Sequence, residues 1–204
     1  MEILIADKSH TKYTDIICET IAESAAVRGT GIARRNPEYI TKKLENGNAV
    51  IALDGDKFAG FCYIEIWGHG KYVANSGLIV HPDYRNAGLA KKIKHRIFKH
   101  SREKFPDAKV FSITTGLAVM KMNTDLGYRP VPFSELTDDP SFWDGCQTCK
   151  NYDVLTRTNR KMCLCTGMLY DPKAKKTEPI KIKEKVFDRL KHIKEAMFLK
   201  KDKK

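Results

Sequence analysis

Residues 76–90 read SGLIVHPDYRNAGLA, and this stretch decides the fold. Its first part, residues 76–82, is an apolar strand that ends at a proline. Its last part, residues 85–90, opens a helix that is expected to run to about Lys104. Three small side chains in the turn let a ligand approach the backbone. The first N–H groups of a helix have no internal partners, and they lie at the positive end of its dipole. The turn is therefore suited to binding phosphates.

A dinucleotide-binding turn uses similar chemistry, but its fingerprint needs three glycines in G-x-G-x-x-G order, which this sequence lacks. The pattern Arg85, Gly88 and Ala90 instead resembles GNAT-type N-acyltransferases. In that family R/Q-x-x-G-x-G/A binds the pyrophosphate of acyl-coenzyme A, and residues 80–84, VHPDY, match the usual lead-in. The alternative is an ordinary strand-to-helix turn. The resemblance assigns cofactor binding to Arg85, Asn86, Ala87, Gly88, Leu89 and Ala90.

The composition is that of a water-soluble globular domain, with 42% hydrophobic and 30% charged residues in a chain of 204. The N-terminal residues 1–7 lack a basic segment and a long apolar run, which indicates a first strand rather than a signal peptide. No stretch approaches the roughly 20 apolar residues that span a membrane. We therefore expect a cytoplasmic protein without membrane partners.

The net charge of +12 is unevenly distributed. Residues 171–204 hold 13 Lys or Arg and 6 Asp or Glu, a net +7, which leaves +5 for the other 170 residues. A basic core suits a polyanionic cofactor or an acidic acceptor. For the tail, a solvated helical face is favoured over contact with nucleic acid, which is an unlikely partner.

The order of the predicted strands and helices is that of the GNAT family, and the resemblance implies an α/β (α+β) fold of the GNAT type, with a mixed, mostly antiparallel sheet flanked by helices. The acyltransferase domain covers 1–170, with a cysteine-bearing insertion at 133–160, and a basic tail covers 171–204. An amphipathic helix at 179–200 is expected to pack on the domain or on a second subunit of a homodimer. The predicted strands are 2–6, 48–53, 58–67, 72–80, 108–114, 128–132 and 161–170, and the other helices are 11–27, one after Asn36-Pro37, and 116–126.

The resemblance places the pantetheine of acyl-coenzyme A along a splayed strand whose backbone here is Leu78, Ile79 and Val80. A backbone amide of this strand polarises the thioester carbonyl. The attacking amine must be neutral, so a base is needed, and Glu65 is the first candidate because apolar residues bracket it on its strand. A partly buried carboxylate has a raised pKa. The alternative is that Glu65 faces solvent.

The leaving thiolate in this family usually meets a tyrosine on the helix after the fifth strand. Aligning Gly127-Tyr128 with the family's Gly-Phe places that position at Asn123. An asparagine donates a hydrogen bond but delivers no proton. The chain therefore departs from the family pattern, and either water or another residue protonates the thiolate.

The segment between the first two helices sets acceptor specificity in the family, and here it contains Arg28, Arg34 and Arg35. Guanidinium groups bind carboxylates with two parallel hydrogen bonds. With Lys121 and Asn75 as further candidates, this segment favours a small acidic amino acid. The alternative is a basic loop that grips the coenzyme's phosphates. The chain also looks similar to bacterial GNAT proteins grouped with N-acylglutamate synthases of arginine biosynthesis, which makes glutamate the leading acceptor. Acetyl-CoA and succinyl-CoA both remain as donors.

Four cysteines follow a C-x-x-C, C-x-C pattern: Cys146, Cys149, Cys163 and Cys165. Four thiolates at this spacing predict a structural zinc site that anchors the insertion. The alternative is a set of free thiols that line a pocket or the core. The main hypothesis is an N-acyltransferase for a small-molecule amine; a protein lysine or N-terminal acetyltransferase is the runner-up, and a zinc-stabilised nucleic-acid-binding module is the third.

Overall fold

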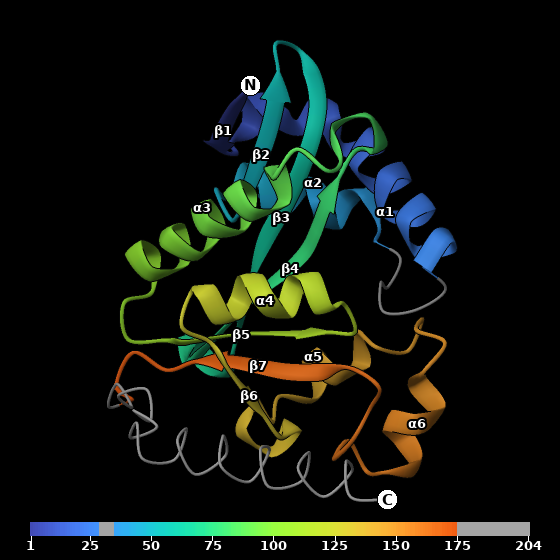
Figure 1. The fold of residues 1–204 in the computed structure, drawn as a ribbon, viewed down its shortest axis with the longest axis vertical. Coiled ribbons are helices and arrows are strands. Elements are labelled where there is room, and N and C mark those ends of the chain that lie inside the picture. The colour runs from blue at the N-terminus through green and yellow to red at the C-terminus, as the bar shows by residue number, and fades with distance from the viewer. Residues whose placement is uncertain (29–34, 175–204) are drawn as a thin grey trace, which may run out of the picture. The chain divides into compact units, whose positions relative to one another are not determined.

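The structure is a computed structural model that describes residues 1–28 and 35–174. Seven strands form one sheet in the order β1-β2-β3-β4-β5-β7-β6 (Figure 1). All neighbouring strands are antiparallel except β4 and β5. This architecture confirms the predicted fold class. The strands are β1 (Glu2–Ile5), β2 (Ala49–Asp54), β3 (Lys57–Trp67), β4 (Tyr72–Val80), β5 (Lys109–Thr114), β6 (Arg129–Val131) and β7 (Thr166–Tyr170).

The helices begin where the sequence provides caps or turns. The Asn36 side chain accepts a hydrogen bond from the Glu38 backbone at 2.8 Å, with Pro37 in the first turn of α2. Gly88 precedes the first residue of α3 with a left-handed φ of 74°, which glycine adopts without strain. The α-helices are α1 (Thr14–Arg28), α2 (Pro37–Glu45), α3 (Leu89–Lys104), α4 (Leu117–Asp125), α5 (Pro140–Asp144) and α6 (Tyr152–Arg157).

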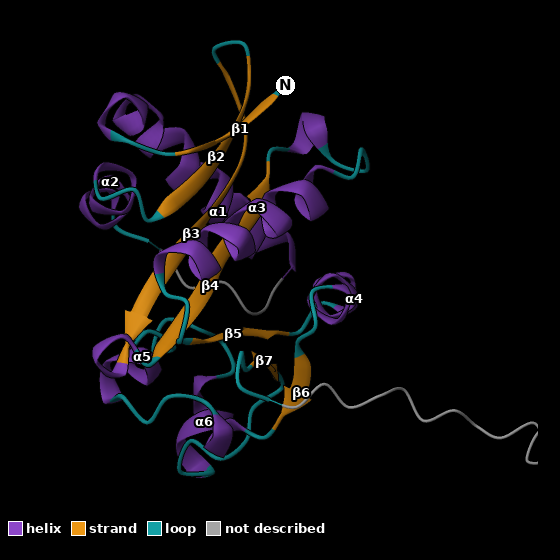
Figure 2. Cartoon of the chain, turned by 90° about the vertical axis from the view of Figure 1, so that its left-hand side faces the viewer, coloured by secondary structure: helices purple, strands orange, loops and turns teal. Residues whose placement is uncertain are grey.

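Helices cover both faces of the sheet. Ile17 and Ile21 of α1 and Leu44 of α2 pack against one face, in a cluster with Phe61. Leu89, Ile93 and Ile97 of α3 are buried against the other face. Figure 2 shows α2 and α3 on opposite sides of β3 and β4. Each sheet face thus has its own hydrophobic core, and β3 and β4 lie between the two.

The sheet opens between β4 and β5. These two parallel strands pair only over Tyr72–Ala74 and Lys109–Phe111. In Figure 1, β4 runs diagonally away while β5 lies nearly horizontal. From Asn75 onward, the edge of β4 that faces β5 has no partner strand in the described part of the chain. Its backbone N–H and C=O groups are therefore available to a ligand.

A β-bulge marks the middle of β4. The pairing with β3 shifts between Phe61 and Tyr63, and Gly77 lies in the shifted stretch with a φ of 65°. The ring of Tyr63 packs so closely that a β-carbon on Gly77 would lie 2.3 Å from Tyr63 Cε1. The bulge bends the strand just before Leu78, which agrees with the splayed strand that the sequence predicts.

The insertion at 133–160 folds into short helices rather than a plain loop, because Phe142, Trp143 and Leu155 are buried against β5 and β7. The last strand is shorter than predicted, beginning at Thr166. The predicted helix at 179–200 lies outside the described residues. Among the helices of the described residues, none has the length and apolar character needed to cross a membrane.

Candidate active site

A cavity of about 480 Å³ lies at the opening between β4 and β5. This volume is within the range of small-molecule sites. Its walls come from β3, β4 and β5, from α1, α2, α3 and α4, and from the insertion. The polar residues that line it include Arg35, Tyr39, Glu65, Ser76 and Ser112. The cavity therefore combines an apolar wall with one acid, one guanidinium group and several hydroxyls.

Glu65 faces this cavity, and its residue surface is 9% exposed. The Tyr39 hydroxyl donates a hydrogen bond to Glu65 Oε1, and the Ser76 hydroxyl donates one to Glu65 Oε2 at 2.8 Å. Burial and the nearby carboxylate raise the pKa of the Tyr39 phenol far above its ordinary value, so Tyr39 remains a donor. Each carboxylate oxygen keeps a further lone pair for a proton. The geometry is that of an oriented, partly enclosed base, and the alternative of a solvent-facing side chain does not hold.

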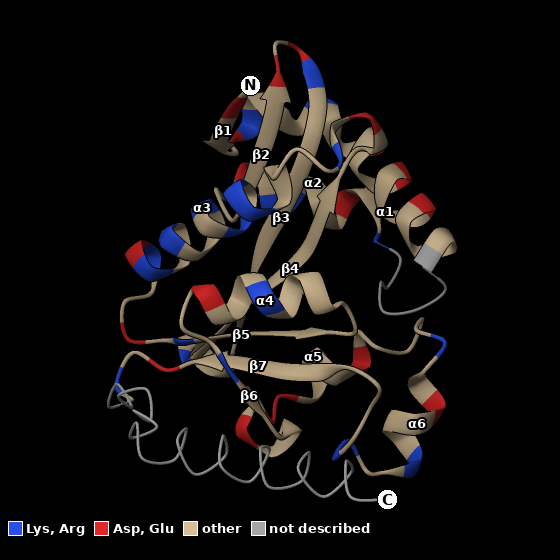
Figure 3. Ribbon diagram, in the orientation of Figure 1, with Lys and Arg blue, Asp and Glu red and all other residues tan. Residues whose placement is uncertain are grey.

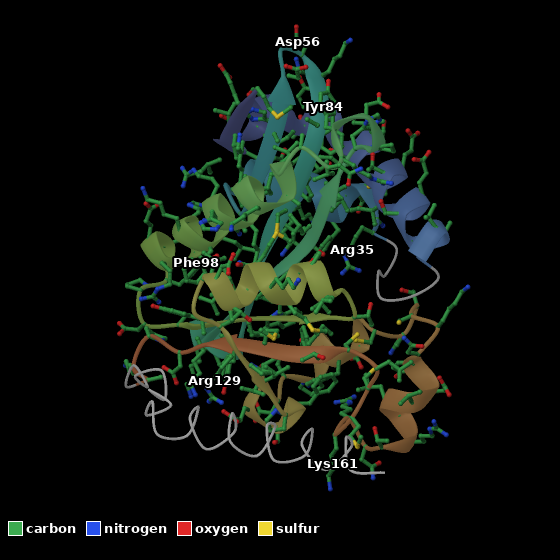
Figure 4. The ribbon with its side chains drawn as sticks, viewed as in Figure 1. Arg35, Asp56, Tyr84, Phe98, Arg129 and Lys161 are labelled. Atoms are coloured by element: carbon green, nitrogen blue, oxygen red, sulfur yellow. The ribbon has the colours of Figure 1, made fainter. Side chains whose placement is uncertain are left out.

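Two cations stand near this carboxylate. Arg35 Nε donates to the Tyr63 hydroxyl at 2.5 Å, and Figure 4 shows the Arg35 side chain beside β4. The Lys43 ammonium lies 4.7 Å from the ring centroid of Tyr39 and 5.6 Å from that of Tyr63. Burial lowers the pKa of Lys43, although the Glu65 charge opposes that shift. The region around the base thus has an excess of positive charge.

The turn of residues 85–90 lies at the start of α3, as the sequence predicts, and its residues 85–88 are exposed. Arg85 anchors it, because its guanidinium donates to the Val80 carbonyl at 3.2 Å and to the Ser24 hydroxyl at 3.3 Å. Within the described chain, no backbone N–H from Asn86 to Ala90 has a hydrogen-bond acceptor. Figure 3 shows Lys and Arg residues along α3, the helix that follows this turn. Amides and charges of this kind suit the binding of an anion.

Two predicted site residues do not line the cavity, and a third lines it while bonding to α3. Asn123 is fully buried and does not line the cavity; its amide donates to Ser112 Oγ at 2.8 Å. Asn75 lines the cavity, and its amide donates to Ser101 Oγ of α3 at 2.8 Å, because β4 directs alternate side chains to opposite faces. Lys121 is exposed on α4 and does not line the cavity. The side chain of Arg28 and all of Arg34 lie outside the described residues.

The four cysteines gather at the insertion side of the same cavity, where all are half-buried and free. The described residues contain no group of three or more His, Cys, Asp or Glu side chains placed to hold a metal ion. Two of the sulfurs are instead directed at the backbone: the Asn151 N–H donates to Cys149 Sγ at 3.5 Å, and Cys163 Sγ lies 4.0 Å from the Asn151 carbonyl. The predicted zinc geometry is therefore not formed, and the structure shows the alternative of thiols that line a pocket.

Sequence reasoning missed Tyr39 and Tyr63, which orient Glu65 and Arg35. Tyr63 lies two residues before Glu65 on β3, so strand alternation places both on one face and gives a signal for Tyr63. Tyr39 has no comparable signal, because its contact with Glu65 depends on how α2 packs on the sheet.

Residues 32–122 match the model of the acetyltransferase (GNAT) family. Among solved structures, Rv2747 from Mycobacterium tuberculosis, in complex with CoA and NLQ, is similar with a TM-score of 0.60 and 13% identity, over 84% of this chain and 99% of that one. N-acetylglutamate synthase from Neisseria gonorrhoeae, complexed with coenzyme A and N-acetyl-glutamate, also has a TM-score of 0.60 and 13% identity, over 85% of this chain. This chain spans only 35% of that synthase.

A third similar structure is the ribosomal-protein-alanine N-acetyltransferase from Brucella melitensis, with a TM-score of 0.55 and 12% identity, over 84% of this chain and 99% of that one. No curated protein matches the sequence significantly. The match to the family model covers less than half of this chain, and together with the splayed sheet and the turn of residues 85–90 it makes the chain similar to GNAT acetyltransferases. At 12–13% identity, these structures establish the fold and leave the acceptor open.

Proposed function

We propose that this protein transfers an acetyl group from acetyl-CoA to the amine of a small acidic amino acid, with glutamate as the leading acceptor. One observation carries the proposal: a buried carboxylate, Glu65, and a guanidinium group, Arg35, line the same cavity beside the free edge of β4. The Glu65 carboxylate can accept a proton from the amine of the acceptor, and the Arg35 guanidinium group can bind the carboxylate of the acceptor.

The proposed reaction is direct attack in a ternary complex. The pyrophosphate of acetyl-CoA binds the turn of residues 85–90, and the pantetheine pairs with the backbone of Leu78–Val80. Glu65 accepts a proton from the acceptor ammonium, directly or through water, so that the neutral amine attacks the thioester carbonyl. A backbone amide of β4 donates to the developing oxyanion, a contact typically worth several kcal/mol in the transition state.

The similar structures support an acidic acceptor in a limited way. The synthase from Neisseria gonorrhoeae carries N-acetyl-glutamate beside coenzyme A, and the mycobacterial protein carries NLQ beside CoA. Enclosure of the cavity by the insertion, through Phe142 and Cys146, also favours a small acceptor. A protein acceptor is the second candidate, and the fold shared with the ribosomal-protein-alanine N-acetyltransferase is the observation in its favour.

The test is thiol release from acetyl-CoA and from succinyl-CoA, measured in parallel over the common amino acids and over short peptides. We expect release from acetyl-CoA with glutamate or aspartate only. Activity on peptides alone would favour the second candidate, and activity with succinyl-CoA alone would change the donor. In the same assay Glu65→Gln is expected to lower kcat by about a hundredfold while CoA affinity is kept. An unchanged pH–rate profile in that variant would remove Glu65 as the base.

A further inference from the structure

Lys94 is a buried cation that the proposed function does not use. It lies in the second turn of α3, and its residue surface is 1% exposed. A buried ammonium loses its hydration and normally has a carboxylate partner. Lys94 makes no ion pair with any acid in the described residues. Its nearest polar contact is Asn75 Oδ1 at 3.4 Å, and its ammonium lies 5.0 Å from the ring centroid of Tyr128.

The polar side chains around Lys94 are held in place by hydrogen bonds to one another. Asn75 is held from two sides, because it donates to Ser101 Oγ at 2.8 Å and accepts from the Tyr128 hydroxyl at 3.0 Å. Ser101 in turn donates to the Ile97 carbonyl at 2.8 Å. The network keeps the Asn75 carbonyl oxygen toward Lys94 and leaves the other ammonium protons for another acceptor.

The position of Lys94 indicates which group accepts these remaining ammonium protons. Asn75 directly follows Ala74, the last residue of β4 that pairs with β5. The ammonium therefore stands where the two strands part, and Lys94 lines the cavity together with Ile79 and Ser112. It is also six residues along α3 from Gly88, a rise of about 9 Å. A cofactor that starts at the turn of residues 85–90 and follows the β4 edge approaches Lys94 with its reactive end.

We propose that Lys94 is the proton donor to the departing thiolate of coenzyme A, an inference that rests on the proposed function. The amine nitrogen bonds to the acetyl carbon, the carbon–sulfur bond breaks with its electron pair going to sulfur, and the nitrogen loses its second proton to solvent to give the neutral amide. A proton of the Lys94 Nζ ammonium then moves to that sulfur and gives the neutral thiol of coenzyme A. Lys94 regains a proton from solvent, and Glu65 releases the proton it took from the acceptor. This assignment provides the proton that Asn123 is unable to supply.

The electrostatics agree with this role. Burial lowers the pKa of Lys94 to about 8, close to that of an ordinary thiol. The titratable groups that face it are the Cys62 thiol on β3 and the Tyr128 phenol just before β6. Burial raises the pKa of Cys62 to about 11 and that of Tyr128 well above its ordinary value. Both groups are neutral where Lys94 titrates, so Lys94 alone changes charge there.

The first test needs no variant. The ultraviolet absorbance of the thiolate reports the pKa of the coenzyme A thiol when it is bound to the wild-type protein. An adjacent ammonium is expected to lower that pKa by at least about one unit relative to free coenzyme A. An unchanged thiol pKa would overturn the inference. Failure of the wild-type protein to bind coenzyme A at all would instead overturn the proposed function.

The second test compares Lys94→Met with Lys99→Met, since Lys99 is an exposed lysine on the same helix. Lys94→Met is expected to lower kcat about a hundredfold with little change in KM, and to return the bound thiol to its free pKa. It should also remove the decline of the wild-type rate above about pH 8. Lys99→Met should match the wild type. A wild-type kcat and pH profile in Lys94→Met would show that the lysine has only a structural role.

Discussion

Gly77 gives the sharpest test of how the site is built. The substitution Gly77→Ala adds a β-carbon 2.3 Å from Tyr63 Cε1 and 2.8 Å from Tyr63 Cδ1. Tyr63 has no free space in which to move, because it is fully buried and its hydroxyl accepts from Arg35. The added methyl group therefore overpacks the core, at a cost of about 1–3 kcal/mol.

Backbone strain adds to this cost. Gly77 has a φ of 65°, and an L-residue in the left-handed region costs roughly 1–2 kcal/mol. The sum is a loss of about 2–5 kcal/mol in the free energy of unfolding, a large part of the usual total. The bulge also positions Leu78, so the relief of the overlap is expected to move the cofactor-binding edge and weaken CoA binding.

The matched control is Gly55→Ala. Gly55 has a φ of 59°, and a β-carbon there meets nothing within 4 Å, so this variant carries the backbone strain alone. Urea unfolding gives both free energies, and titration calorimetry gives both CoA affinities. We expect Gly77→Ala to lose about 1–3 kcal/mol more than Gly55→Ala, with weaker CoA binding in the first variant only. Equal losses would refute the packing of Tyr63 under the bulge.

Three further predictions concern charge. Gly88→Asp should weaken CoA binding at least about tenfold relative to the neutral Gly88→Asn, because its negative charge repels the phosphates. Asp and Asn both tolerate the left-handed φ of this position, so the two variants differ mainly in charge. Equal affinities by calorimetry would show that the CoA phosphates do not bind this turn. Because the pKa of Lys94 is about 8 in the folded protein and ordinary when unfolded, the unfolded state binds more protons between these values, and stability should rise from pH 8 to 10 by about 2 kcal/mol. Urea unfolding over this range should show no such rise in Lys94→Met. Burial and neighbouring thiols raise the pKa of Cys146 to about 11 and that of Cys165 to about 12, so alkylation of both should be slow at pH 7 and accelerate about tenfold per pH unit. Stoichiometric zinc, with alkylation released by a chelator, would contradict the free-thiol arrangement.

Local sequence signals determined most of the fold. The apolar run before Pro82 and the small residues after Arg85 predict a strand, a turn and a helix, and the structure has them as β4 and α3. Asn36 and Pro37 predict the start of α2 in the same way. These predictions succeed because caps, turns and hydrophobic periodicity act within a few residues of one another.

The site depended on distances across the sheet that no local pattern contains. Strand alternation turned Asn75 to the α3 face and Ser76 to Glu65, and the packing of α2 added Tyr39 to the same carboxylate. The spacing of the cysteines alone predicted a metal site, whereas the described structure directs two of the sulfurs to the backbone of Asn151. The sequence by itself determined the elements and the glycine-containing turn before α3, whose conformation is local. Only the tertiary structure decided which side chains share the cavity, because that depends on register, splay and burial between segments far apart in the chain.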